Sequence, residues 1–158
     1  MGLTKYIDKI ITKFFDRVEL SEGKTSVIAL FHNKKLLILQ RGDTAPWMPN
    51  KWSLVGGSVD EGEDTMWTAM REATEEIGVG SVKNVQFIKK IQTTDIGEIH
   101  YFIGELENDK VILNYENKDY QFIRIDEIDN YKFVPYIKDF IKNIHLWNPS
   151  KYWENKKK

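Results

Sequence analysis

Acidic side chains gather in one short stretch of this chain, at a spacing that points to metal chemistry. Glu72, Glu75 and Glu76 occupy positions i, i+3 and i+4 directly after Arg71, and Glu63 lies shortly before them. Like charges at such spacing destabilise a helix, and one arginine can offset only part of the repulsion. A solvated helix face is the common alternative for a run of charges. A divalent cation among the carboxylates would supply the missing positive charge.

The residue types narrow the choice of cation. Hard cations such as Mg²⁺ take oxygen ligands and usually bind through a few carboxylates together with substrate phosphates. The chain contains no cysteine, and no histidine lies between residues 57 and 79. These features favour Mg²⁺ or Mn²⁺ over zinc, and they suggest phosphate chemistry.

The carboxylates belong to a segment that is predicted to be helical. Residues 64–77 carry acidic residues at the start and good helix formers in the middle, and Gly78 provides a stop signal. An apolar stripe recurs at helical spacing through Met66, Ala69, Met70, Ala73 and Ile77. The three glutamates fall on a different face, so we expect one face to pack and the other to hold the carboxylates.

The spacing of the whole segment resembles a known family signature. From Gly57 to Val79 the chain reads G-x5-E-x7-R-E-A-x-E-E-x-G-V, which closely resembles the signature of the Nudix hydrolases. The fixed positions are Gly57, Glu63, Arg71, Glu72, Glu75, Glu76, Gly78 and Val79. Ala73 stands where a larger aliphatic residue is usual, and Val55 where many members have proline. Neither departure removes a charged group, and the resemblance extends over roughly residues 25–144.

The resemblance implies a fold and an activity. The fold would be of the α/β (α+β) class, an α/β/α sandwich with a mixed β-sheet. The activity would be Mg²⁺-dependent hydrolysis (or Mn²⁺-dependent) of a nucleoside diphosphate linked to another moiety, by attack of water on a phosphorus atom. A nucleotide is therefore the expected partner.

The resemblance also implies roles for the residues of the signature. Glu72, Glu75 and Glu76 would be metal ligands, joined by the backbone carbonyl of Gly57. Glu72 or Glu75 would also activate the attacking water, and the sequence leaves that choice open. We expect Arg71 and Glu63 to form an ion pair that orients the ligand carboxylates.

Further site residues are expected outside the signature. Some family members place another metal-binding or basic glutamate where this chain has Glu116, although an exposed loop residue is an equal alternative and Asp119 is a weaker rival. Arg41 is a candidate for contacting phosphate, and Trp47 and Trp52 could stack on a base. A packing role is the alternative for both tryptophans.

The substrate is less closely defined than the reaction. Motifs typical of ADP-ribose, dinucleoside polyphosphate, NADH and coenzyme A hydrolases are missing, which favours a MutT-like (d)NTP pyrophosphohydrolase. Hydrolysis of ADP-ribose, a nucleotide sugar, a dinucleoside polyphosphate or the 5′ end of RNA remains open, as does a non-catalytic nucleotide-binding domain.

Hydrophobic patterns outline the elements that must position these residues. Short apolar runs predict strands over residues 27–31, 36–40, 82–92, 100–106 and 120–125, and a closing helix over 134–146. Residues 6–18 have the pattern of an amphipathic helix, which is expected to pack on its own domain or to form a subunit contact in a possible homodimer. We therefore expect an N-terminal amphipathic helix at 1–22, a Nudix domain at 23–147 and a C-terminal tail at 148–158.

Composition excludes several classes of protein. The chain has 158 residues, enough for one compact domain, and its formal net charge of -1 argues against duplex nucleic acid as a partner. The absence of cysteine excludes disulfides and thiol catalysis. The sequence has no apolar run long enough to cross a membrane, so no membrane partner is expected and the cytoplasm is the expected location.

Overall fold

A mixed β-sheet forms the centre of the computed structural model, which describes residues 23–144. The predicted N-terminal helix and the tail beyond residue 144 lie outside the described residues. The strands are β1 (Lys24–His32), β2 (Lys35–Arg41), β3 (Trp52–Ser53), β4 (Val55–Ser58), β5 (Lys83–Gln92), β6 (Glu98–Glu105) and β7 (Asn117–Ile123). The helices are α2 (Thr65–Ile77), the 3₁₀ helix η1 (Ile125–Asn130) and α3 (Lys138–Lys142).

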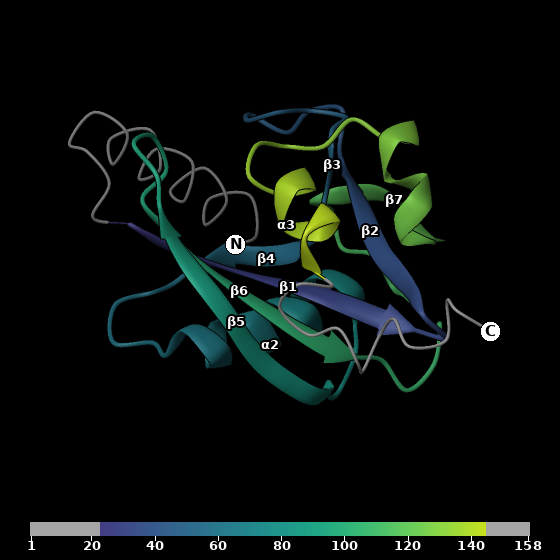
Figure 1. The fold of residues 1–158 in the computed structure, drawn as a ribbon, viewed down its shortest axis with the longest axis horizontal. Helices are drawn as coiled ribbons and strands as arrows, with labels where there is room; N and C mark the ends of the chain where they lie inside the picture. The colour runs from purple at the N-terminus through teal and green to yellow at the C-terminus, as the bar shows by residue number, and fades with distance from the viewer. Residues whose placement is uncertain (1–22, 145–158) are drawn as a thin grey trace.

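Strand β1 organises the sheet (Figure 1). Along one edge it pairs in parallel with β6, which pairs antiparallel with β5. Along its other edge, the first half of β1 pairs with β4 and its last residues pair with β2. Strand β2 then carries β3 and β7. The sheet is mixed, as the sequence predicts.

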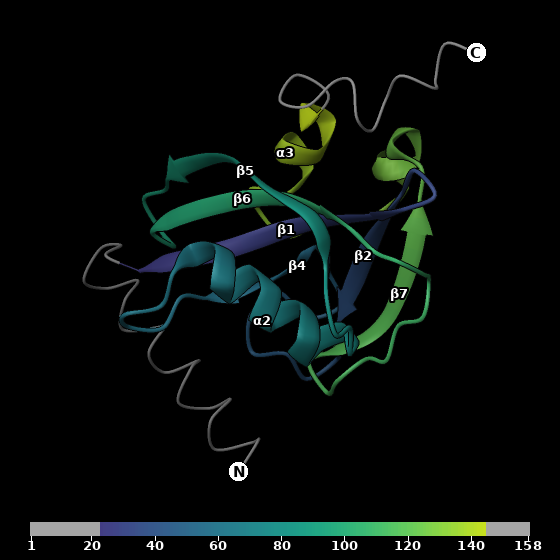
Figure 2. The ribbon, with the colours of Figure 1, turned by 90° about the horizontal axis from the view of Figure 1, so that it is seen from below.

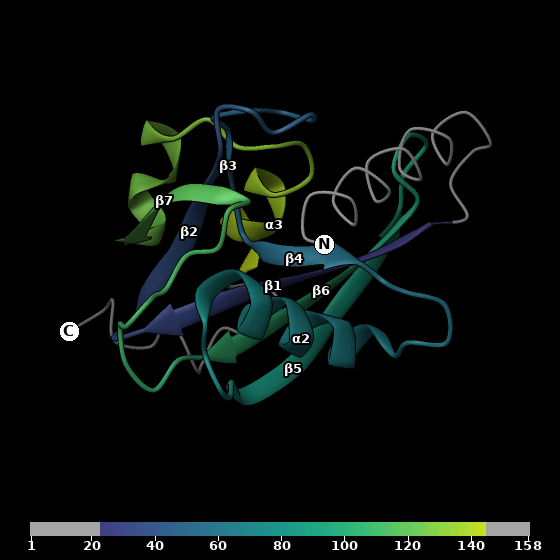
Figure 3. The same cartoon turned by 180° about the vertical axis from the view of Figure 1, so that it is seen from behind.

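Helices cover both faces of this sheet. Figure 2 shows α2 against one face and α3 on the opposite side. In Figure 3, which views the molecule from behind, α2 lies in front of the sheet. Alternate residues of β1 enter the two cores, with Val27, Ala29 and Phe31 on the α3 side and Ile28 and Leu30 on the α2 side. This burial on both faces explains why β1 reads as an almost continuous apolar run. The predicted α/β/α sandwich is confirmed.

The closing helix differs from its prediction. The sequence predicts a helix from residue 134, but α3 begins only at Lys138. Pro135 disfavours helical backbone at Val134, and Tyr136 adopts a left-handed φ of 71°. Strand β7 also begins three residues before its predicted start. No helix within residues 23–144 has the length and apolar character needed to span a membrane.

Candidate active site

Helix α2 carries the acidic cluster and is fixed at both ends. Asp64 is its N-cap, and its carboxylate accepts the N–H of Trp67 at 3.4 Å. Gly78 ends the helix with a left-handed φ of 72°. The last carbonyls of the helix receive N–H groups from the loop before β7, Ile112 to Ile77 at 3.0 Å and Asn114 to Glu76 at 3.3 Å. The predicted helix and its stop signal are confirmed.

The carboxylates of α2 do not share one solvated face. Glu72 is 2% exposed and Glu76 is 5% exposed, whereas the side chain of Glu75 is 41% exposed. The prediction that one face packs while a separate face holds the glutamates was therefore wrong for two of the three. Glu72 and Glu76 lie on the side of the helix that packs against the sheet, together with Ala69 and Ala73. Burying two carboxylates is costly unless a partner compensates for the lost solvation.

Gly57 of β4 makes room for Glu72. A Cβ atom at position 57 would overlap the Glu72 carboxylate. Strand β4 is held in place because Gly57 lies opposite Ser26 of β1, and the Ser26 hydroxyl donates to the Thr65 carbonyl at 2.7 Å. Sequence, strand pairing and helix position together bring Gly57 and Glu72 into contact.

Glu63 and Arg71 form the predicted ion pair. Arg71 Nε donates to Glu63 Oε2 at 2.7 Å, and the Arg71 Nη2 donates to Glu63 Oε1 at 3.0 Å. This two-point contact lowers the pKa of Glu63 from 4.5 to about 2 and raises the pKa of Arg71. The other terminal nitrogen, Nη1, lies 3.2 Å from Glu72 Oε1 and 3.1 Å from Glu75 Oε1. Arg71 therefore connects Glu63 to two of the predicted metal ligands.

The sequence prediction missed Thr68, which also contacts Glu63. Its hydroxyl lies 2.7 Å from Glu63 Oε1, and the residue is fully buried. The signal available in the sequence was the position of Thr68, a polar residue directly before Ala69 on the side of the helix that faces the sheet.

Glu76 has an unfavourable electrostatic environment for a charged carboxylate. Burial raises the pKa of its carboxyl well above 4.5, and the nearby carboxylates of Glu72 and Glu116 raise it further. The N–H of Gly56 and the charge of Arg41 oppose this shift. Glu76 therefore feels the charge of Glu72, one turn away on the same helix, and of Glu116, which is distant in sequence.

Glu116 is brought to this site by its backbone. Its carbonyl accepts the N–H of Gly42 at 3.1 Å, and its N–H donates to Asn114 Oδ1 at 3.1 Å. Its rival Asp119 is exposed on β7, opposite Gln40. The electrostatic contact with Glu76 supports Glu116 as the site residue.

The predicted substrate residues lie on β2, β3 and the loop between them. Arg41 donates through Nε to the Trp47 carbonyl at 2.8 Å, and its guanidinium lies 5.4 Å from the centre of the Trp47 ring. Trp52 instead packs edge-to-face on Tyr131, with ring centres 5.1 Å apart, and exchanges backbone hydrogen bonds with Lys132 and Val134. The charge of Arg41 acts on Glu76, and Trp47 lies beside Arg41, whereas Trp52 has a packing role.

The donor set fits a hard divalent cation. The candidate ligands are all oxygen donors, and the repulsion that Glu72 and Glu116 exert on buried Glu76 would be relieved by positive charge. Within residues 23–144, no three acidic or histidine side chains are already gathered as a finished metal cluster. The Glu75 carboxylate instead contacts Arg71 Nη1, at 3.1 Å.

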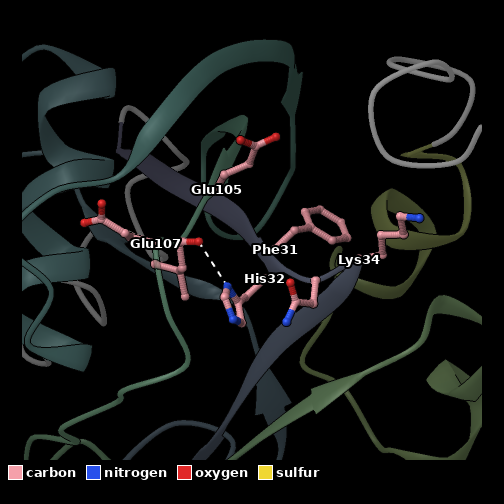
Figure 4. Close-up of a pocket in the computed structure, with 7 residues that line it drawn as sticks. Phe31, His32, Lys34, Glu105 and Glu107 are labelled. Atoms are coloured by element: carbon pink, nitrogen blue, oxygen red, sulfur yellow. Dashed lines mark hydrogen bonds between the residues drawn. The ribbon is translucent and has the colours of Figure 1, made fainter.

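A surface pocket lies away from the carboxylates. It has a volume of about 290 Å³ and lies where the β1–β2 turn meets the end of β6 (Figure 4). Its glutamates are engaged elsewhere, Glu105 with Asn84 at 2.7 Å and Glu107 with Lys83 at 2.9 Å. No predicted site residue lines it.

Comparison with known proteins agrees with this geometry. The family model described as NUDIX domain matches residues 23–144. Over 63 residues the chain is 40% identical to a Caenorhabditis elegans protein assigned as nudix hydrolase 7. The matched region covers 37% of this chain and 21% of that protein. The chain thus matches only about a fifth of the length of this curated relative.

Solved structures share the fold. A MutT protein from Methanosarcina mazei Go1 has 21% identity and a TM-score of 0.63, covering 78% of this chain and 93% of that one. An Ap4A hydrolase binary complex from C. elegans has 17% identity and a TM-score of 0.63, covering 77% and 96%. The E. coli dihydroneopterin triphosphate pyrophosphohydrolase has 19% identity and a TM-score of 0.60, covering 78% and 94%. With the signature in place on α2 and the family domain spanning the whole described fold, the chain belongs to the Nudix hydrolase family.

Proposed function

We propose that this protein hydrolyses the pyrophosphate bond of a nucleoside diphosphate linked to another moiety, with Mg²⁺ or Mn²⁺, and that its substrate is a (d)NTP as in MutT-like enzymes. The observation that carries the proposal is the burial of Glu72 and Glu76 beside Glu116. A stable fold gains nothing from three carboxylates that repel one another in a poorly solvated site. Retaining them makes sense where a cation and a phosphate chain bind.

Each residue of the site has a role in this reaction. We assign Glu72, Glu75, Glu76 and Glu116 as cation ligands, together with the Gly57 carbonyl. When bound, the cation would make a water molecule more acidic and would neutralise charge on the phosphate oxygens. Glu72 or Glu75 accepts the proton of the attacking water.

The remaining residues orient the ligand carboxylates or contact the substrate. Glu63 fixes Arg71, and Arg71 in turn fixes the carboxylates of Glu72 and Glu75. Arg41 is placed to contact a phosphate, because its charge already acts on Glu76. The Trp47 ring beside Arg41 offers a face on which a base can stack.

The relatives support the substrate class. Proteins with this fold include a MutT protein, and two others are named as hydrolases of compounds with a polyphosphate chain, Ap4A and dihydroneopterin triphosphate. The absence of the sequence motifs of other subgroups favours the (d)NTP among these possibilities.

A substrate panel tests the proposal. The purified chain would be assayed with NTPs, dNTPs, oxidised dGTP, ADP-ribose, nucleotide sugars and dinucleoside polyphosphates, each with Mg²⁺ and with Mn²⁺. We expect turnover of a (d)NTP that chelation of the metal abolishes. Hydrolysis in ¹⁸O-labelled water, followed by mass spectrometry of both products, would show which phosphorus the water attacks.

The variant Glu76→Gln is the matched negative control, and Glu61→Gln, an exposed acidic residue before the helix, is the control for charge alone. Faster turnover of a nucleotide sugar, ADP-ribose or a dinucleoside polyphosphate would replace the (d)NTP as the substrate. No turnover of any compound would instead favour a nucleotide-binding domain without catalysis.

A further inference from the structure

Thr68 is a buried polar residue on α2 that occupies a variable position of the family signature. Its relative exposure is 0%, and its neighbours in sequence place it on the side of the helix that faces the sheet. A buried hydroxyl without a hydrogen bond is costly, so its partner is informative.

The Thr68 hydroxyl has two acceptors within reach but only one hydrogen to donate. Glu63 Oε1 lies at 2.7 Å, and the carbonyl of Asp64, one turn earlier, lies at 3.1 Å. A carboxylate is the stronger acceptor, and the shorter distance agrees with a charge-assisted bond. The hydrogen therefore goes to Glu63.

This bond restrains the orientation of Glu63. Oε1 also accepts the N–H of Asp60 at 3.1 Å, so the carboxylate is held from the loop on one side and from the helix on the other. Glu63 in turn occupies Nε and Nη2 of Arg71, which leaves Nη1 pointing at Glu72 and Glu75. A rotation of the Glu63 carboxylate would break this match of donors and acceptors.

We propose that Thr68 is a positioning residue for the carboxylate site: its hydroxyl holds Glu63 in the orientation that turns Arg71 towards Glu72 and Glu75. The inference rests on the proposed metal-dependent function for its consequence, since misplacing these glutamates weakens cation binding. Its structural part, the effect of Thr68 on Arg71, stands independently of the metal.

The test compares three variants of the full-length protein. Thr68→Val removes the hydroxyl at nearly constant volume, and Thr68→Ser keeps the hydroxyl but loses the methyl group. Thr74→Val makes the same chemical change at an exposed position of the same helix. Thr68→Ala serves as the hydroxyl-free variant if valine prevents folding. Mn²⁺ affinity would be measured from the electron paramagnetic resonance signal of free Mn²⁺, and the Arg71 Nε–H resonance would be followed by NMR.

We expect Thr68→Val to weaken Mn²⁺ binding roughly 10-fold, at the lower end of what partners of metal ligands contribute. The Arg71 Nε–H resonance should shift and exchange faster with water. Thr68→Ser should restore both properties to within about twofold of the wild type, and Thr74→Val should change neither.

Two results would overturn the inference. One is an Arg71 resonance in Thr68→Val that matches the wild type, whatever the metal result. The other is a serine variant as impaired as the valine variant, which would show that the methyl group and its packing matter. Absence of Mn²⁺ binding by the wild-type protein would refute the proposed function, while the Arg71 resonance would still decide the role of Thr68.

Discussion

The Glu76 carboxylate is buried beside two other carboxylates, so its charge works against the folded state. Its raised pKa expresses the same fact, because the fold favours the neutral form. A residue that lowers stability in this way is typical of a site built for a ligand. Stability and function should therefore respond in opposite directions when its charge is removed.

Glu76→Gln tests this opposition. Glutamine keeps an acceptor for the Gly56 N–H and removes the repulsion from Glu72 and Glu116, so the metal-free variant should melt roughly 2 to 5 °C higher than the wild type. The kcat should fall at least about 100-fold, because charge is lost where the cation must be held. Differential scanning calorimetry and a turnover assay would check both. A variant that melts lower, or that turns over within a few-fold of the wild type, contradicts this assignment.

The Glu63–Arg71 pair predicts a dependence of stability on pH. Arg71 lowers the pKa of Glu63 from 4.5 to about 2, so the pair stabilises the fold fully above pH 4.5. That stabilisation is lost as the pH falls from about 4.5 towards 2. The difference in free energy of unfolding between the wild type and Glu63→Gln should therefore be largest at pH 7 and smaller at pH 3. Urea denaturation at the two pH values measures it, and an equal difference at both would show that the pairing contributes nothing.

At the scale of elements, the sequence predicted α2 well because its local signals agree. Asp64 caps it, Gly78 ends it, and its apolar stripe has the correct period. The burial of Glu72 and Glu76 could not be read in the same way. The burial of Glu72 depends on Gly57 of β4, and the pairing of β4 with β1 places this glycine against α2. Such a contact between distant segments has no local sequence signal.

The other differences also come from tertiary contacts. The polar start of β7 is a strand because Asn117 and Asp119 pair with Arg41 and Gln40 of β2. Polar residues such as these have low strand propensity, so the sequence alone did not predict a strand there. Trp52 was a candidate for stacking on a base, and its contact with Tyr131 is made by a segment about eighty residues away. The Arg71–Glu63 pair was predicted from the family signature, and it forms because Glu63 lies in the loop before α2, which returns to the helix.

The approach of β4 to α2 gives a prediction about Gly57. In Gly57→Ala the new methyl group would overlap the Glu72 carboxylate and displace it, so we expect kcat to fall roughly 100-fold with the fold retained. Gly80→Ala is the matched control, because no atom lies within 4 Å of the Cβ it would gain. Circular dichroism and the turnover assay would be compared for the two variants. Wild-type turnover by Gly57→Ala would mean that the Glu72 carboxylate can move without consequence.

For the whole molecule, the N-terminal end of the described domain is joined to the sheet. The first described residues are tied to the sheet, since Gly23 accepts the N–H of Glu98 at 2.9 Å and Lys24 accepts that of Val59 at 2.9 Å. The domain boundaries at residues 22 and 147 stay predictions, although the family match begins at residue 23.

Deleting residues 1–22 tests the predicted amphipathic helix. We expect the shortened protein to keep the oligomeric state of the full chain and to melt at a lower temperature, because the apolar face predicted for this segment is expected to pack on its own domain. Light scattering coupled to size-exclusion chromatography gives the mass, and calorimetry gives the Tm. Loss of a dimer on deletion would instead assign the segment to a subunit contact.

The order of the site residues along the chain has a consequence for how such proteins diversify. The groups assigned to bond breaking lie almost entirely within one continuous stretch, from Gly57 to Glu76, whereas Arg41 ends β2 and Trp47 lies in the loop that follows it. Mutations that reshape that loop leave the Gly57–Glu76 stretch intact. If these assignments hold, we expect a descendant of this chain to be able to acquire a new substrate through changes in that loop while the reaction is preserved.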